Sequence, residues 1–249
     1  MTIFIAIYIT LLGLTLGSFY NVVGLRIPAA ESLLHPPSQC PKCGTRLTPL
    51  DLIPVLSYLL SRGKCRHCGT RVSPMYLFGE AATGLLFLVM YLKFGLTLEG
   101  ITGMLLVSLT VIITVSDLRY MLIPDKVLLF FAPVFLVLVP FMAEVPLWYH
   151  LLGALSGGGV LLLLALFGGM GMGDVKLFAL LGWIIGWPNV IVAFLMACAL
   201  GAAIGGIMQL LGIVQRKQPI PFGPFLALGS LLSYLFGPDI IGAYLSFIG

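Results

Sequence analysis

Charged residues and histidine are scarce in this sequence. Lys and Arg number 13 and Asp and Glu 9, so 9% of the 249 residues are charged and 60% are apolar. Soluble domains carry about 25% charged residues, so a soluble protein is excluded and an integral membrane protein is expected. The three histidines, His35, His67 and His150, are too scattered for a catalytic Ser-His-Asp set. The start of the chain has no basic segment, so no cleaved signal peptide is expected.

Long apolar runs make up most of the chain. Those of about 20 residues, enough to span a bilayer, lie near 3–24, 77–96, 100–122, 127–145, 149–168, 190–212 and 222–248. A shorter run at 175–187 makes eight if it also crosses. We therefore expect an all-α polytopic membrane protein of about eight transmembrane helices with a small cytoplasmic zinc-binding loop that uses four cysteines. Its parts are a first helix (1–24), the loop (25–76) and a membrane domain (77–249).

The placement of basic residues predicts the orientation. Seven of the 13 Lys and Arg lie between Arg26 and Arg71. The positive-inside rule therefore makes this loop cytoplasmic and puts the N-terminus outside. Alternation through eight spans leaves only Lys93 outside. The other basic residues near span ends then fall on the inner side, namely Arg119, Lys126, Lys176, Arg216 and Lys217.

Four of the five cysteines form two Cys-x-x-Cys pairs, Cys40 with Cys43 and Cys65 with Cys68, separated by 21 residues. Two residues between thiolates allow both sulfurs to reach one ion at about 2.3 Å, and four such sulfurs close a structural zinc site. The gap slightly exceeds the usual zinc spacing of about 15–20 residues. Two disulfides are the alternative, which a reducing cytoplasm disfavours. Since the loop is too small for its own core, the metal is expected to hold it folded.

Acidic residues inside apolar spans are the strongest functional signal, because a carboxylate at membrane depth costs about 2.5–3.5 kcal/mol on insertion scales. Asp174 lies in Gly171-Met172-Gly173-Asp174-Val175-Lys176, where the glycines allow another chain to approach. The alternative is an ordinary helix start with an acid at the dipole. Asp117 lies in the third span at a similar depth, so helix packing can bring the two acids together. Asp125 is a poorer partner for Asp117, because eight helical residues span about 12 Å and a proton-sharing pair needs about 3 Å.

Two aspartates in contact share one proton, so one acts as a base while the other acts as an acid. The base takes a proton from water, which attacks a peptide carbonyl, and the acid protonates the carbonyl oxygen. Nothing else in the sequence supplies a nucleophile or a catalytic metal. The residues therefore predict hydrolysis of a membrane-adjacent peptide near the cytoplasmic face.

For several other polar residues the sequence allows both a structural and a functional interpretation. Asn21 forms an interhelical hydrogen bond or has a functional role, and Arg26 can be a simple interfacial anchor. Glu80, at the start of the second span, caps the helix dipole or lines a polar site. Asp125 opens the fourth span as an N-terminal acid. The stretch Pro219-Ile220-Pro221-Phe222-Gly223-Pro224 is a clamp at a helix entry or a wall of the site.

Taken together and in order, these pieces resemble the bacterial type IV prepilin peptidases, a bifunctional family of leader peptidases and N-methyltransferases. The resemblance covers nearly the whole chain. It rests on Gly17-Ser18-Phe19 with Asn21-Val22-Val23 and Arg26, the paired cysteines, the Glu80 helix, Asp117 with Pro124-Asp125, the Gly171–Lys176 stretch and the Pro219–Pro224 stretch.

The resemblance implies cleavage of prepilin and pseudopilin leaders after a Gly by Asp117 and Asp174, and methylation of the new N-terminal residue from S-adenosylmethionine. It implies the bacterial inner membrane, a cytoplasmic active site, prepilin and membrane lipid as partners, and no nucleic acid. It implies that the N-terminal stretch and the loop at 25–76 form the methyltransferase part and that 77–249 is the aspartic peptidase domain. Candidates for binding the methyl donor are Gly17, Asn21 and Arg26. Supporting residues are Gly171, Gly173, Lys176, Asp125 and Glu80.

The sequence leaves three alternatives to the bifunctional peptidase and methyltransferase. The chain could be a prepilin peptidase without methyltransferase activity. It could be a proton-coupled transporter with a zinc ribbon, although a transporter would spread its charges through the bilayer. It could be a Gly-x-Gly-Asp protease that cuts in the middle of a membrane helix, although the depth of the aspartates disfavours this.

Overall fold

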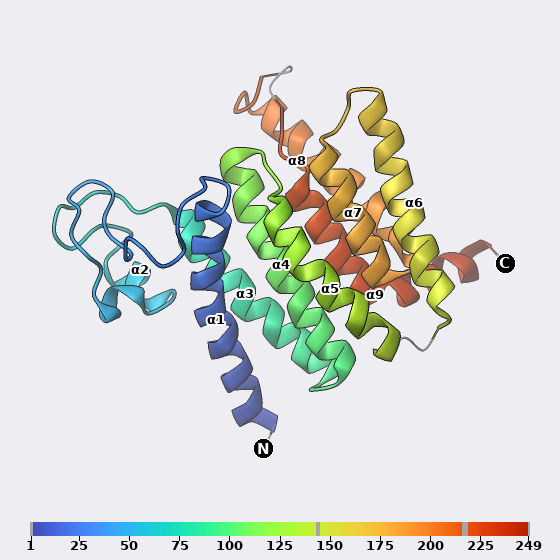
Figure 1. Cartoon of the computed structure of the whole chain (residues 1–249), viewed down its shortest axis with the longest axis horizontal. Helices are drawn as coiled ribbons and strands as arrows, with labels where there is room; N and C mark the ends of the chain where they lie inside the picture. The colour runs from blue at the N-terminus through green and yellow to red at the C-terminus, as the bar shows by residue number, and fades with distance from the viewer. Residues whose placement is uncertain (1, 143–144, 216–218, 249) are drawn as a thin grey trace.

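The computed structural model describes residues 2–142, 145–215 and 219–248 and is helical, as the sequence predicts (Figure 1). Within these residues there are eight long helices, two short ones and no β-strand. The elements are α1 (Thr2–Arg26), η1 (Pro49–Leu52), α2 (Leu56–Leu60), α3 (Pro74–Phe94), α4 (Leu98–Tyr120), α5 (Asp125–Met142), α6 (Leu147–Leu166), α7 (Met172–Ile185), α8 (Asn189–Leu210) and α9 (Gly223–Ile248).

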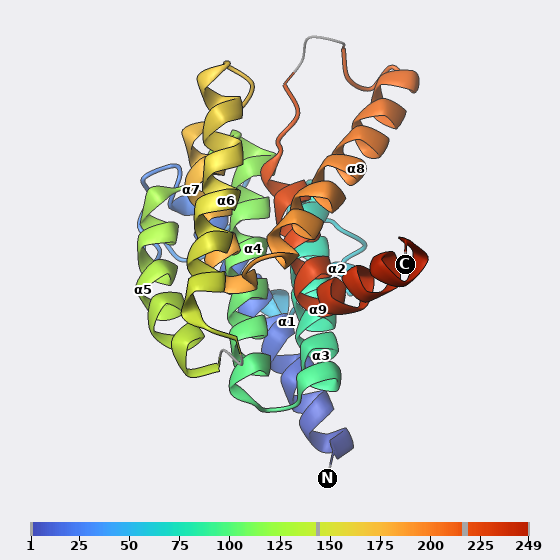
Figure 2. The ribbon, with the colours of Figure 1, turned by 90° about the vertical axis from the view of Figure 1, so that its right-hand side faces the viewer.

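Seven of the long helices are long and apolar enough to cross a membrane, which fits a multi-pass membrane protein. The exception is α7, whose 14 residues rise about 21 Å, against a hydrocarbon core of about 30 Å. It nevertheless returns the chain along α6 (Figure 2). Gly153 near the start of α6 packs on Gly182 near the end of α7, and the N–H of Trp187 donates to the carbonyl of Tyr149 at 2.9 Å. The eight-helix arrangement follows from this antiparallel pairing.

Helix α4 is the centre of the bundle and packs against α1, α3, α5 and α9. In its most apolar stretch 72% of the residues are buried, against 17% for α1, so α4 faces protein while α1 mostly faces outward. Small residues allow close helix approach at these contacts. A Cβ on Gly24 of α1 would lie 2.8 Å from the carbonyl oxygen of Ile112 in α4. The Tyr20 hydroxyl donates to Ser108 Oγ at 2.7 Å across the same contact.

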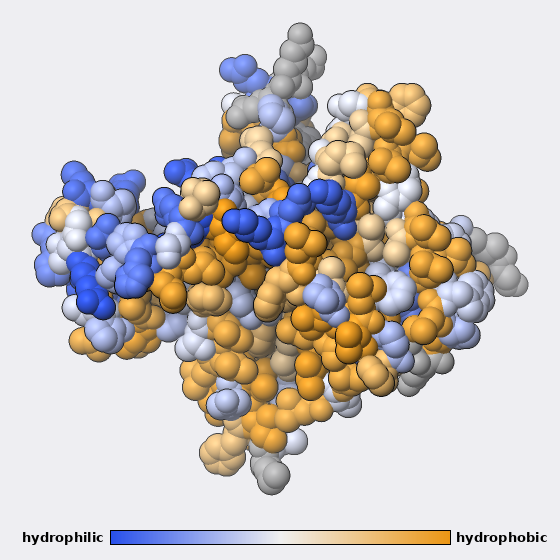
Figure 3. Space-filling view, viewed as in Figure 1, coloured by the Kyte–Doolittle hydropathy of each residue, from blue (hydrophilic) through white to orange (hydrophobic). Residues whose placement is uncertain are grey.

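Basic residues gather at one end of the bundle, hereafter the basic end. Alternating helix directions bring together the end of α1, the end of α4, the start of α5 and the start of α7, with Arg26, Arg119, Lys126 and Lys176. Lys93 lies at the other end, paired with Asp239. Arg216 and Lys217 lie outside the described residues. The space-filling view shows hydrophilic residues at the basic end and a broad apolar surface below it (Figure 3).

Residues 27–73 form a small lobe beside α1 and α3, hereafter the cysteine lobe (Figure 1). Helix α3 begins at Pro74, three residues before the predicted span. Ser73 caps its N-terminus by accepting a hydrogen bond from the N–H of Met75. Along the chain, the lobe directly follows the last residue of α1 and directly precedes the first residue of α3.

Candidate active site

Asp117 lies in the last turn of α4 and is 5% exposed. Its Oδ2 accepts a hydrogen bond from the N–H of Gly223, the first residue of α9, at 2.8 Å. A Cβ on Gly223 would lie 2.7 Å from the same oxygen, so only glycine fits there unless the carboxylate moves. The positive end of the α9 dipole therefore faces the carboxylate. The 219–224 stretch both enters a helix and contacts Asp117, and sequence reasoning did not identify Gly223 as that contact.

Asp174 is the third residue of α7 and is half-buried. Its Oδ2 accepts a hydrogen bond from the N–H of Gly171 at 3.3 Å, so it also lies at a helix N-terminus. Gly173 packs against Ile123, whose side chain would lie 3.0 Å from a Cβ there. The missing side chain of Gly173 thus lets α7 approach the loop that follows Asp117.

The loop at residues 121–124 joins the end of α4, which carries Asp117, to the start of α5, which begins at Asp125. Ser116 Oγ donates to the carbonyl of Leu122 at 2.5 Å. Lys176 Nζ contacts both carboxylate oxygens of Asp125 at 2.8 and 2.9 Å, which ties the start of α5 to the start of α7. Asp125 is therefore an ion-pair partner as well as an N-terminal acid.

Both aspartates lie at the basic end, Asp117 in the last turn of α4 and Asp174 in the first turn of α7. Helix α7 packs on α5 and α9, and both of these pack on α4. No direct hydrogen bond joins the two carboxylates among the described residues. Packing of these helices thus places both carboxylates at the same end of the bundle.

The three methyl-donor candidates have different surroundings. Gly17 packs against α3, where a Cβ would lie 2.9 Å from the Cα of Glu80. Asn21 is 1% exposed and its Nδ2 donates to the carbonyl of Tyr76 at 3.1 Å, which is an interhelical bond. Its Oδ1 has no hydrogen-bond partner among the described residues. Arg26 binds the start of the cysteine lobe, through the carbonyls of Ser32, Leu33 and Pro36.

Glu80 does not cap a helix dipole, and that reading of the sequence is wrong. Because α3 begins at Pro74, Glu80 lies in its second turn and is 8% exposed. Its Oε2 accepts a hydrogen bond from the N–H of Val55 at 2.7 Å. Val55 has a φ of 62°, a conformation that costs roughly 1–3 kcal/mol for a residue other than glycine. Glu80 therefore anchors a strained turn of the cysteine lobe to the membrane helices.

The four paired cysteines come together in the lobe and can hold a metal ion. All four sulfurs lie within 4.8 Å of one another, and the sulfurs of Cys40 and Cys68 are 3.7 Å apart. A tetrahedral zinc with ligands at about 2.3 Å places its sulfurs about 3.8 Å apart, so the geometry fits that ion. The described residues contain no disulfide.

The two cysteine pairs have the same local structure. The N–H of Cys40 donates to the carbonyl of Thr45, and the N–H of Cys65 donates to that of Thr70. Each threonine hydroxyl also lies near the preceding cysteine sulfur, at 3.2 Å for Cys43 and 3.3 Å for Cys68. The hydrogen bond with Thr70 lowers the pKa of the Cys68 thiol to about 6, and the bond with Thr45 lowers the pKa of Cys43.

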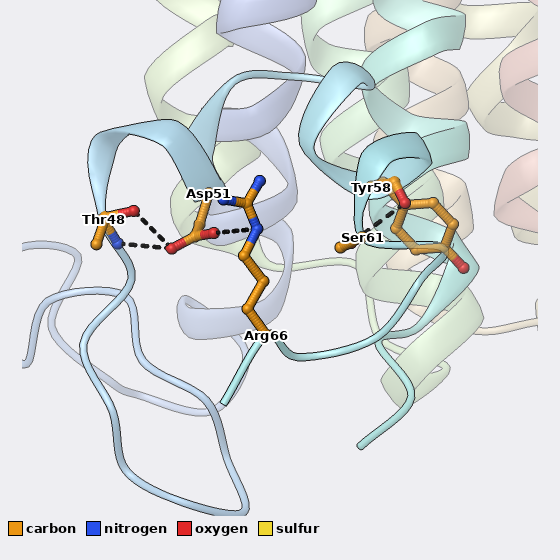
Figure 4. A network of polar contacts seen from close by, with 5 residues as sticks. All are labelled: Thr48, Asp51, Tyr58, Ser61 and Arg66. Carbon is orange, nitrogen blue, oxygen red and sulfur yellow. Dashed lines mark hydrogen bonds and ion pairs between the residues drawn. The ribbon is translucent and has the colours of Figure 1, made fainter. Parts of the chain in front are cut away.

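Sequence reasoning missed these threonines. The repeated Cys-Gly-Thr-Arg at residues 43–46 and 68–71 would have revealed them. A polar network outside the sulfurs then links η1 with the second pair (Figure 4). Arg66 Nε lies 3.1 Å from Asp51 Oδ1, and Thr48 donates to Asp51 Oδ2 through its N–H and its hydroxyl. η1 is thereby attached to the second pair.

Comparisons with known proteins cover nearly the whole chain. The prepilin leader peptidase/N-methyltransferase of Bacillus subtilis is 42% identical over 94% of this chain and 95% of its own. The protein belongs to the type IV leader peptidase family. The model of that family matches residues 104–206, and the model of the bacterial peptidase A24 N-terminal domain matches residues 11–94.

Other relatives in this family carry the same name. The Pseudomonas aeruginosa protein is 33% identical, over 96% of this chain and 93% of its own. The Aeromonas salmonicida protein is 34% identical, with the same coverage. No solved structure matches the chain. The leader peptidase match contains Asp117 and Asp174 and ends before Gly223, so the hydrogen-bond partner of Asp117 lies outside it.

Proposed function

We propose that this chain is an aspartic endopeptidase that removes the leader of type IV prepilins or pseudopilins after a Gly and then methylates the new N-terminal residue. Asp117 and Asp174 are the catalytic pair. The observation that carries the proposal is that two acids 57 positions apart in the chain lie at one end of the bundle, each accepting a hydrogen bond from a backbone N–H at the start of a helix. The peptidase and methyltransferase names of the relatives support it.

The reaction follows from how the pair holds protons. A water molecule between the carboxylates gives a proton to the ionised one while its oxygen bonds to the scissile carbonyl carbon. The other aspartic acid donates its proton to the carbonyl oxygen. When the carbon–nitrogen bond breaks, the amine leaving group takes the proton from the first aspartic acid. A hydroxyl of the tetrahedral intermediate gives its proton to the second aspartate, so the pair again holds one proton. The Gly223 N–H fixes one oxygen of Asp117, so the opposite oxygen is free for water.

We infer that the basic end faces the cytoplasm of a bacterial cell and that the protein lies in the inner membrane. The gathering of basic residues supports this orientation. We also infer that Cys40, Cys43, Cys65 and Cys68 hold a structural zinc, supported by their mutual distances. When bound, the zinc supplies the crosslink that a lobe without a large core needs.

Methylation requires S-adenosylmethionine, and its support here is the name of the relatives. Of the three candidate residues, Gly17 is covered by α3 and Arg26 is engaged with lobe carbonyls. Asn21 alone has a buried polar atom without a partner among the described residues, so it is the candidate that remains.

Mass spectrometry of a co-expressed prepilin tests both activities, because it reports the cut position and the methyl group. The variants Asp117→Asn and Asp174→Asn should each leave the leader attached while the protein still inserts. Asp239→Asn, which removes an acid at the opposite end of the bundle, is the matched control and should cleave normally. Full cleavage by either active-site variant would refute the catalytic pair. A cleaved but unmethylated product from the unmodified enzyme would indicate a peptidase without methyltransferase activity.

A further inference from the structure

The cysteine lobe exposes a row of large apolar side chains, hereafter the leucine patch. They come from η1, α2 and the turn between them, a stretch of only 11 residues. The members are Leu50, Leu52, Ile53, Leu56, Leu59 and Leu60, each between 38% and 68% exposed. Contiguous exposed apolar residues of this kind mark a contact surface rather than ordinary surface variation. The patch is not part of the metal centre or of the acidic pair.

Beside the leucine patch lies a pocket of about 630 Å³ with three basic side chains, Arg62, Lys64 and Arg71. Its lining also includes Tyr58 and Ser73. Among the described residues, none of the three cations pairs with a carboxylate, since the three ion pairs found there use Arg66, Lys93 and Lys176. The basic pocket therefore has an unbalanced positive charge.

Two features show that the pocket is suited to an anion. Lys64 and Arg71 face each other across an antiparallel bridge, where like charges destabilise each other unless a counter-ion lies between them. The lining also includes Pro74, the first residue of α3, so the positive end of that 21-residue helix adds to the field. A phosphate group satisfies both requirements.

The position of the lobe identifies where such a phosphate comes from. Pro74 begins a helix that can cross a membrane, so the pocket lies at the level where that helix begins. Helix α2 lies alongside α1 rather than beyond its end (Figure 1). The space-filling view shows apolar residues on the lower edge of the lobe and hydrophilic residues above them (Figure 3). The lobe thus continues the division between polar end and apolar belt that the membrane helices have.

We propose that the lower side of the cysteine lobe docks on the surface of the surrounding bilayer and binds anionic phospholipid. The leucine patch enters the boundary between headgroups and acyl chains, as the apolar face of an interfacial helix does. Arg62, Lys64 and Arg71 bind the headgroup phosphates above it. Lipid contact fixes the height of the metal centre relative to the membrane helices, in addition to the anchor between Glu80 and Val55.

Hydrogen exchange measured by mass spectrometry on the full zinc-loaded chain in nanodiscs tests this proposal. Amides of residues 50–62 should exchange more slowly in phosphatidylcholine discs that contain phosphatidylglycerol than in phosphatidylcholine alone. Each juxtamembrane cation contributes enough for roughly a fivefold change in the docking equilibrium. The triple variant Arg62→Gln/Lys64→Gln/Arg71→Gln should therefore lose the difference between the two lipids.

The control variant is Lys42→Gln/Arg46→Gln, which removes two cations from the first cysteine pair, outside the basic pocket. It should keep the lipid difference, and both variants should keep their zinc content. Leu59→Ser/Leu60→Ser should speed exchange in both lipids. Prepilin cleavage by the triple variant should persist, so the result is independent of the proposed catalytic pair.

Three results would overturn the proposal. The first is equal exchange of residues 50–62 in the two lipids. The second is that inorganic phosphate, added to phosphatidylcholine discs, slows exchange of these amides as much as phosphatidylglycerol does. That result would make the pocket a site for free anions. The third is that exchange of these amides slows only after a prepilin is added, in either lipid. That result would make the leucine patch a substrate-docking surface.

Discussion

Replacing Gly223 by Ala tests whether the start of α9 positions the carboxylate of Asp117. Alanine keeps the backbone free to form a helix, so the change adds one methyl group at one contact. That methyl would lie 2.7 Å from Asp117 Oδ2, where ordinary contacts begin at 3.4 Å, so the carboxylate or the helix must move by about 0.7 Å. The hydrogen bond of 2.8 Å from the Gly223 N–H cannot survive such a shift unchanged.

The size of the effect follows from the bond that is lost. A hydrogen bond to a charged group contributes about 1.5–3 kcal/mol. If the carboxylate depends on this bond for its catalytic position, cleavage should slow by about 10- to 100-fold, at 1.36 kcal/mol for each factor of ten. Overpacking also lowers stability, by about 1–3 kcal/mol. The thermal midpoint should therefore fall modestly while most of the protein stays folded at the assay temperature.

The assay is the initial rate of prepilin cleavage in membranes at matched enzyme levels. The matched control is Gly206→Ala in α8, because a Cβ at Gly206 has nothing within 4 Å, and its rate should equal that of the unmodified enzyme. Serine at position 223 should be at least as harmful as alanine. A Gly223→Ala enzyme with an unchanged rate would show that Asp117 needs no contact with α9 and would refute the reasoning.

Three further predictions concern stability and the metal. Cys65→Ser should reduce bound zinc well below one equivalent and make the cysteine lobe sensitive to protease, measured by metal analysis and limited proteolysis; full zinc occupancy would contradict a site built from all four cysteines. Gly182→Ala should destabilise the protein by about 1–3 kcal/mol in thermal unfolding, because the new methyl group meets the backbone of Gly153. Its control is Gly159→Ala, where the new methyl group enters open space, and this change should be neutral or stabilise the protein by up to about 1 kcal/mol. Lys176→Met should change stability by less than about 1 kcal/mol, since its ion pair is half exposed, and a large loss would mean that the pair is more than a surface contact.

The helices could be predicted from the sequence because membrane spans depend on local composition. The errors lie at helix ends. Hydropathy begins the second span at 77, although Ser73-Pro74 is a cap followed by proline at the first helical position, which marks a helix start. This error puts Glu80 at the helix terminus and suggests the wrong role for it. The partner of Glu80, Val55, could not be read from sequence, because it depends on how the cysteine lobe folds back.

The acidic residues of the candidate site could be predicted from the sequence, whereas the residues that contact them could not. Asp117 and Asp174 stand out because carboxylates are costly in apolar runs. Gly223 does not stand out, since its role arises only where α9 meets α4, 106 positions from Asp117 along the chain. That both acids lie at one end of the bundle, on helices linked through α5 and α9, is likewise a property of packing. The predicted zinc ligands, by contrast, follow from local spacing, and the structure brings them together.

The central position of α4 ties together the two parts that family models describe separately. One side of α4 receives α1 at Ile112 and Ser108, and its last turn supplies Asp117 to the other part. A chain cut in the turn between α3 and α4 would therefore produce two fragments that must find each other in the bilayer. A homologue that lost its first three helices would need new side chains on the vacated flank of α4, so gain or loss of the N-terminal part requires coordinated change along that helix.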